Sequence, residues 1–136
     1  MFKQDLIYVT STTTTLVATD GVIPLQFTKR RRGYASVLGA NAVQLNKAGY
    51  YHITGLVIFE GTNAGIASIA VFKNGVEQND STTAVTTNAT ATTLFTLPID
   101  MVVRVFCNEA PTLITLVNTG VGITVTNTQL TIEYEG

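Results

Sequence analysis

The chain has 136 residues, of which 46% are hydrophobic and only 12% charged, and its formal net charge is -1. This length fits one domain, and a net charge near zero provides no field that would attract nucleic acid or an anionic membrane. No apolar run reaches the roughly 20 residues that span a bilayer, and the single cysteine, Cys107, excludes an internal disulfide. Soluble domains usually contain about 25% charged residues, so we expect other subunits to cover part of this surface.

Threonine, valine and isoleucine are abundant along the chain, and these β-branched side chains favour strands over helices. Glycine- and asparagine-containing turns separate short β-forming runs at the spacing typical of a sandwich. We therefore predict an all-β antiparallel sandwich of about eight to ten strands and no helix. Residues 1–15 are predicted to be either a peripheral strand or an arm that attaches the chain to a partner, and residues 16–136 the sandwich domain. The first residues lack the pattern of a signal peptide, so we expect folding in a cytoplasm.

Residues 49–60 form the most informative predicted strand, because both of its faces are apolar. Tyr51, Ile53, Val57 and Phe59 alternate with a second set that includes Leu56 and Ile58. A strand with one wet face would alternate apolar and polar residues, so we expect this strand in the middle of a sheet with its second face covered by another subunit.

The following segments continue the strand pattern. The next strand runs into Asn74-Gly75, a dipeptide preferred in two-residue type I′ hairpin turns. Residues 79–93 have few large apolar anchors and are predicted to be an exposed loop or a weak edge strand. Apolar runs from Leu94 onward predict further strands, one of which spans residues 101–107 and buries Cys107. The last predicted strand spans residues 125–134.

The order of these segments resembles the jelly roll of tumour necrosis factor-like and complement globular-head-like proteins. In those proteins a Gly-Tyr-Tyr opens a long central strand, as at Gly49-Tyr50-Tyr51, and the next long strand ends in a turn such as Lys73-Asn74-Gly75. The resemblance implies an antiparallel jelly-roll β-sandwich that assembles as a homotrimer. We expect the trimer interface to contain Tyr51, Ile53, Val57, Phe59, Phe106, Leu130, Ile132 and Tyr134.

The chain is also similar to small virion-associated proteins encoded by phages and prophages of Gram-positive gut bacteria. The similar segments include Val22-Ile23-Pro24-Leu25, the basic run before Gly33, and residues 71–76 and 102–118. This resemblance implies a non-enzymatic virion protein that decorates a capsid or forms a head fibre and is made in the host bacterial cytoplasm. The alternative is an adhesive tip that recognises host surface carbohydrate through loops around Asn63, residues 79–90 and Pro111.

Half of the basic residues lie in one run, Lys29, Arg30, Arg31 and Arg32. This run either docks an acidic surface on a capsid or a neighbouring subunit, since arginine binds carboxylates in a bidentate manner, or is a solvated strand or turn. No aromatic residues alternate with these cations, so we do not expect nucleic-acid binding. If residues 1–15 form an arm, the docking residues would also include Leu6, Ile7 and Tyr8.

The residues predict neither catalysis nor a metal or cofactor site. His52, the only histidine, is expected to be a packed or hydrogen-bonded strand residue. Cys107 has no histidine or aspartate nearby in the sequence to make it a nucleophile. The one segment that suggests a calcium loop, residues 79–81, is more typical of a turn. Tyr34, Tyr50 and Tyr51 are candidates for a sugar-stacking platform, although sheet packing explains the tyrosine pair equally well.

Overall fold

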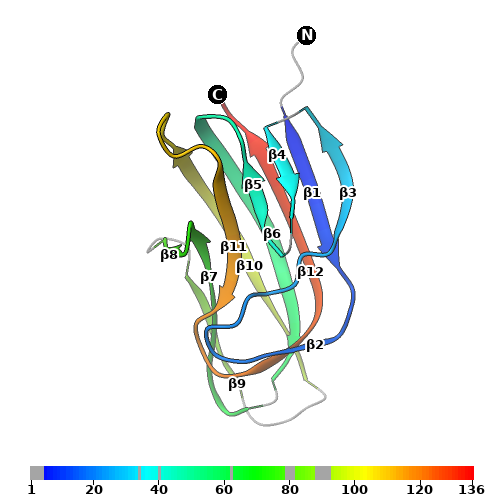
Figure 1. Ribbon diagram of the computed structural model, residues 1–136. Coiled ribbons are helices and arrows are strands. Elements are labelled where there is room, and N and C mark those ends of the chain that lie inside the picture. Colours follow the sequence, from blue (N-terminus) through cyan, green and yellow to red (C-terminus); the bar gives the residue numbers. More distant parts are fainter. Residues whose placement is uncertain (1–4, 34, 40, 62, 79–81, 88–92) are drawn as a thin grey trace.

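The computed structural model describes residues 5–33, 35–39, 41–61, 63–78, 82–87 and 93–136. These residues form twelve strands in two antiparallel sheets that pack face to face, and they contain no helix (Figure 1). The predicted all-β sandwich is therefore confirmed. The strand number exceeds the prediction because several strands have only two or three residues and carry little periodic signal.

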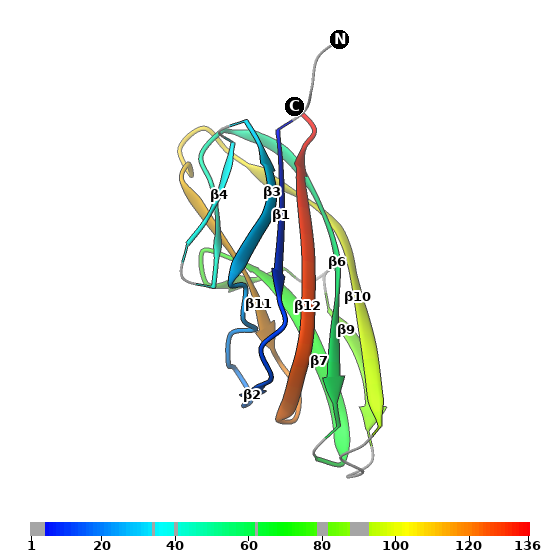
Figure 2. The same ribbon diagram turned by 90° about the vertical axis from the view of Figure 1, so that its right-hand side faces the viewer.

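Sheet A contains the long strands. Its order is β10 (Leu94–Val105), β6 (Gly49–Glu60), β12 (Ile123–Tyr134), β1 (Leu6–Ser11) and β3 (Phe27–Arg32), and β2 (Thr15–Val17) also pairs with β12. Figure 2 shows β3, β1, β12, β6 and β10 side by side in this order. The predicted central position of residues 49–60 is confirmed, since β6 pairs with β10 on one side and β12 on the other.

Sheet B is the shorter layer. Its order is β4 (Ser36–Leu38), β5 (Val43–Leu45), β11 (Thr112–Asn118), β7 (Gly65–Lys73) and β8 (Val76–Glu77), and β9 (Thr83–Thr87) also pairs with β7. The β7–β8 hairpin has the predicted turn, since Asn74 and Gly75 have φ angles of 52° and 80°. The sequence predicts either an exposed loop or a weak edge strand for residues 79–93. Residues 83–87 form the edge strand β9, and residues 79–81 and 88–92 lie outside the described residues.

One continuous apolar core fills the space between the sheets. On β6 the inward side chains are fully buried, and they pack with inward residues of β12, β7 and β11, among them Tyr51, Ile53, Val57, Phe59, Leu130, Ile132, Ile69 and Leu116. A β-bulge between Val125 and Asn127 shifts the alternation along β12. Val125 therefore faces the core together with Leu130 and Ile132, instead of facing the opposite side as strict alternation predicts.

A segment that follows β2 lies alongside the end of β11 and is hydrogen-bonded to it. Val22 forms an isolated bridge with Val117, and the Ile23 amide donates to the Leu116 carbonyl at 2.7 Å. The buried side chain of Asn118 donates to the carbonyls of Val17 and Ala18 at 3.1 and 3.2 Å. These bonds hold the end of β2 against the end of β11, although the two lie about a hundred residues apart in the chain.

Candidate interface on the outer face of sheet A

The outer face of sheet A, defined here as the side that points away from sheet B, carries the side chains that alternate with the core residues. Strand register arranges these side chains in rows that cross the sheet. The rows follow one another from the Glu60 end of β6 toward its Gly49 end. One row crosses three strands and consists of Thr96, Ile58 and Asn127. The next row crosses five strands and consists of Pro98, Leu56, Gln129, Thr10 and Phe27. The next two rows contain Asp100, Thr54, Thr131, Tyr8 and Arg30, and then Val102, His52, Glu133, Leu6 and Arg32.

The two neighbouring rows that contain Ile58 and Leu56 have no charged residue, and we call them the uncharged half of the outer face; the row beyond them contains Leu94, Glu60 and Thr124 and so carries one charge. Phe27 at one margin is 55% exposed, and Leu94, beyond Thr96 on β10, is 59% exposed. Leu56 and Ile58 lie in the middle of the sheet but stay partly exposed, because no further layer of described residues covers them. An exposed apolar patch of this kind is typical of an interaction surface.

The rows that contain Thr54 and His52 carry charges, and the two signs lie on opposite sides of the sheet. His52 Nε2 lies 2.7 Å from Asp100 Oδ1, and its Nδ1 lies 3.9 Å from Glu135 Oε1. Arg30 and Arg32 lie on β3 at the other margin. The predicted hydrogen-bonded strand histidine is confirmed, and its carboxylate partner comes from a residue 48 positions away in the chain.

The basic run forms the edge strand β3. Lys29, Arg30 and Arg31 are exposed, and Lys29 lies in the irregularity where the register with β1 shifts. Arg31 Nε donates to the Ser36 carbonyl at 2.8 Å, which joins β3 to β4. Successive cations and a bulge hinder strand pairing at a sheet edge, so the solvated-strand interpretation of this run accounts for its local structure.

Comparison with known proteins identifies the fold but no family. No protein-family model matches the chain, and no curated protein matches its sequence. The structure of murine APRIL at pH 8.5 is similar, with a TM-score of 0.76 and 14% identity over 97% of this chain and 99% of that chain. The globular domain of zebrafish complement 1qA matches with a TM-score of 0.68 and 6% identity, over 96% of this chain and 95% of that chain. The fold is a tumour necrosis factor-like jelly roll.

A third solved structure also matches this jelly roll. PRD1 vertex protein P5 has a TM-score of 0.62 and 16% identity, and the match covers 97% of each chain. At these identities the comparisons establish the jelly-roll fold alone.

Six of the eight residues predicted at the trimer interface lie inside the jelly roll. Their side chains are 0% exposed in a single chain: Tyr51, Ile53, Val57, Phe59, Leu130 and Ile132. The prediction was wrong for these six, because sheet B of the same chain already covers them and leaves no surface for a second subunit. Phe106, 47% exposed at the end of β10, and the half-buried Tyr134 remain predicted interface residues.

Tyr51 closes one end of the core. Its hydroxyl donates to the Lys47 carbonyl at 2.5 Å, and its ring meets Tyr134 edge to face with centroids 5.1 Å apart. Burial disfavours the charged phenolate and raises the pKa of Tyr51 to about 12. Its role is therefore structural. The predicted sugar-stacking platform of Tyr34, Tyr50 and Tyr51 cannot include Tyr51, because its ring is fully buried. Tyr34 lies outside the described residues.

The predicted docking residues of the N-terminal segment belong to β1, which lies between β12 and β3. The docking prediction is wrong for Ile7, because its side chain is 0% exposed in the core. Leu6 and Tyr8 are half-buried on the outer face, next to Arg32 and Arg30. Residues 6–11 thus form a strand of the sandwich and not a separate arm.

The loops predicted to bind carbohydrate do not converge. Asn63 lies before the Gly65 end of β7, where its amide donates to the Gly122 carbonyl at 3.1 Å. Pro111 lies before β11, whose first residues are near the Lys73 end of β7. These two positions are at opposite ends of the jelly roll, and residues 79–81 and 88–90 lie outside the described residues. The suggested calcium loop at residues 79–81 falls in the same gap.

Cys107 is exposed and not buried in a strand as predicted. Strand β10 ends at Val105, and the chain then turns, with the Glu109 amide donating to the Phe106 carbonyl at 2.9 Å. Within the described part of the chain, no three His, Cys, Asp or Glu side chains are grouped closely enough to hold a metal ion. The described residues also contain no helix that could cross a membrane.

Proposed function

We propose that the chain is a non-enzymatic structural protein of a phage virion that assembles as a homotrimer and decorates a capsid or forms a head fibre. The similarity to a vertex protein of PRD1 supports the virion context, since that protein has the same fold over nearly its whole length. The trimer is the assembly that the tumour necrosis factor-like resemblance implies.

The uncharged half of the outer face is the observation that carries the proposal. Leu56 and Ile58 form its apolar centre and Phe27 lies at its margin, and the uncharged polar side chains of Gln129 and Thr10 lie between Leu56 and Phe27. Burial of apolar surface is the main driving force of association. We propose that a second copy of the chain covers this surface. The trimer interface then contains these outer-face side chains instead of the fully buried side chains predicted from the sequence.

The charges on the same face fit a cyclic arrangement. In a ring each subunit presents two different patches to its two neighbours. Arg30 on the β3 margin and Asp100 on the β10 margin belong to the same cross-strand row. The Asp100 side chain is 75% exposed and opposite in charge to Arg30. The β3 margin of one copy therefore complements the β10 margin of the next copy.

A matched pair of variants tests the interface. Ile58→Glu places a charge on the outer face of sheet A, whereas Ile66→Glu places the same charge on sheet B at a side chain that is 61% exposed. We expect gel filtration to show dissociated Ile58→Glu and an unchanged assembly for Ile66→Glu, with both circular dichroism spectra like that of the wild type. Equal elution of both variants and the wild type would contradict this interface.

The virion role needs a separate measurement. Phage particles induced from the strain that carries the gene are purified by density gradient and analysed by quantitative mass spectrometry. We expect the chain to band with the particles in tens of copies or more, as a decoration or fibre protein would. Absence of the chain from purified particles would refute the virion role and leave the trimer untouched.

A further inference from the structure

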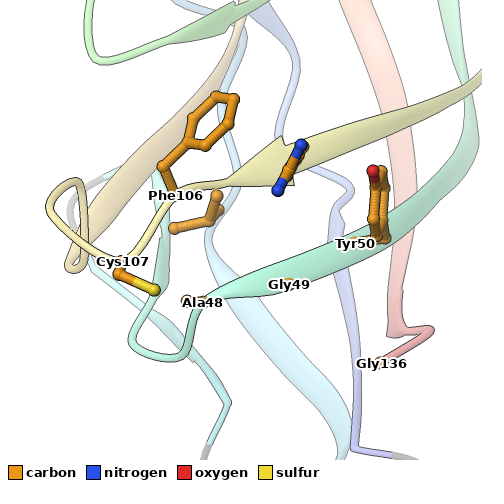
Figure 3. Close-up of a pocket in the computed structure, with 8 residues that line it drawn as sticks. Ala48, Gly49, Tyr50, Phe106, Cys107 and Gly136 are labelled. Carbon is orange, nitrogen blue, oxygen red and sulfur yellow. The ribbon is translucent and has the colours of Figure 1, made fainter.

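A pocket of about 340 Å³ lies at the end of the jelly roll where β6 begins and β10 ends. Tyr50, Arg104, Phe106 and Cys107 contribute to its lining. Figure 3 shows Tyr50 of β6 and Phe106, which directly follows β10, projecting to the same side. This end is the one farthest from the uncharged half of the outer face, because β6 runs from Gly49 at the pocket to Glu60 at the other end.

Arg104 is held between two aromatic rings. Its guanidinium carbon lies 4.4 Å from the centroid of the Phe106 ring and 5.4 Å from that of Tyr50. Such stacking is favourable for arginine and fixes the plane of its donors. Both rings keep open surface beside the guanidinium, since Tyr50 is 45% and Phe106 is 47% exposed.

A second set of contacts fixes Phe106. Its amide donates to Glu109 Oε1 at 2.9 Å, and this hydrogen bond is the main reason why the pKa of Glu109 lies below its usual value. Lys73 Nζ lies 3.2 Å from the other oxygen of Glu109 and donates to the Arg104 carbonyl at 3.0 Å. The lysine and glutamate thus neutralise each other and support the turn that carries Phe106.

The guanidinium of Arg104 has no hydrogen-bond acceptor or carboxylate partner among the described residues. The acids on the neighbouring part of the face are engaged elsewhere, since Asp100 pairs with His52 and Glu135 lies near the same ring. A planar, pre-positioned guanidinium with free donors matches a carboxylate, which it binds through two parallel hydrogen bonds.

We propose that this pocket binds an acidic sugar, with the carboxylate on Arg104 and the apolar face of the sugar ring against Tyr50 or Phe106. A few placed polar groups among aromatic walls are typical of small-molecule sites, and the volume falls at the lower end of their usual range of roughly 300–1,000 Å³. One unpaired cation suits a singly charged carboxylate better than a phosphate, because Lys73 is already neutralised by Glu109. The inference goes beyond the virion proposal and does not rest on it, and it requires that Phe106 stays open to the pocket and does not lie in the trimer interface as the sequence predicts.

Nuclear magnetic resonance titration of the ¹⁵N-labelled chain tests this site. The probes are methyl glucuronide, the neutral methyl glucoside and acetate. We expect methyl glucuronide to shift the Arg104 Nε–H signal and the Tyr50 and Phe106 amides, and to bind at least about tenfold more tightly than the other two probes, since each lacks one part of the recognition. Absence of saturable shifts, or equal binding of acetate and methyl glucuronide, would overturn the sugar site.

Variants locate the binding. Arg104→Lys keeps the charge but loses the planar fork, and Arg31→Lys makes the same change at an exposed position on the distant edge strand β3. We expect about tenfold weaker glucuronide binding in Arg104→Lys and unchanged binding in Arg31→Lys. Phe106→Leu, which removes one ring but no charge, should also weaken glucuronide binding while acetate binding stays the same. If Arg104→Lys instead dissociates the oligomer, the carboxylate comes from a second copy of the chain and the sugar assignment is wrong.

Discussion

Replacement of Asn118 by alanine should strongly destabilise the jelly roll, because this buried side chain makes four hydrogen bonds to backbone groups. The Asn118 amide nitrogen donates to the carbonyls of Val17, Ala18 and Val121, at 3.1, 3.2 and 2.9 Å, and its oxygen accepts the Gly120 amide at 3.0 Å. The side chain is 0% exposed, so water cannot readily replace these bonds in the variant.

The size of the effect follows from these four bonds. The Ala18 carbonyl keeps a partner in the variant, because it also accepts the Gly21 amide at 2.9 Å. The bonds to the Val17 and Val121 carbonyls and from the Gly120 amide are lost as well, and at about 1 kcal/mol for each of these three we expect Asn118→Ala to lose about 3 kcal/mol of unfolding free energy. Substitution of the exposed Asn108 in the turn after β10 should cost less than about 0.5 kcal/mol.

Guanidinium denaturation followed by far-ultraviolet circular dichroism measures both variants, with all chains at one concentration because assembly contributes to stability. The chain has no tryptophan, so backbone dichroism is the suitable signal. If Asn118→Ala and Asn108→Ala have the same unfolding free energy, the anchoring of the β2 end by Asn118 is refuted.

Three further predictions concern charge, titration and exposure. Arg30→Asp should weaken the trimer, measured by its dissociation on dilution. The double variant Arg30→Asp/Asp100→Arg should recover most of the lost trimer stability, and no recovery would argue against contact between the β3 and β10 margins. Burial raises the pKa of Tyr51 from its ordinary value of 10.0 to about 12. The unfolding free energy should therefore be constant with respect to this group below pH 10 and fall between about pH 10 and 12, by roughly 2–3 kcal/mol. Tyr51→Phe should lack that part of the decline, and identical pH profiles for the two proteins would show that Tyr51 does not cause it. Native Cys107 should react with a thiol reagent nearly as fast as in guanidinium, whereas strong protection would restore the buried interpretation.

The architecture could be read from the sequence because local signals agree with the global fold. β-Branched composition, the Gly49-Tyr50-Tyr51 opening and the Asn74-Gly75 turn each specify strands or hairpins without reference to distant residues. The long strands β6 and β12 lie at or near the predicted positions for the same reason, whereas β10 extends over residues 94–105 where the sequence predicts a separate strand over 101–107.

The inner face of β6 was harder to assign, because a period of two separates the faces of a strand without saying which one points inward. Both faces contain large apolar residues. The polar members His52 and Glu60 occur only on the face with Leu56 and Ile58, and this asymmetry was the available signal that Tyr51, Ile53, Val57 and Phe59 form the core. The sequence prediction instead placed those core residues in the subunit contact.

Other features depend on contacts between distant segments. The pairing of His52 with Asp100 and the stacking of Arg104 on Tyr50 arise from the register between β6 and β10, which the sequence does not reveal. The exposure of Cys107 reflects where β10 ends, and strand ends are poorly defined by periodicity alone.

The absolute mass of the wild-type protein, measured by light scattering after gel filtration at micromolar concentration, tests the proposed assembly most directly. The account predicts a mass near three times 14.5 kDa. A mass of 14.5 kDa would contradict it, because the uncharged half of the outer face would then remain open to water without a second copy to cover it.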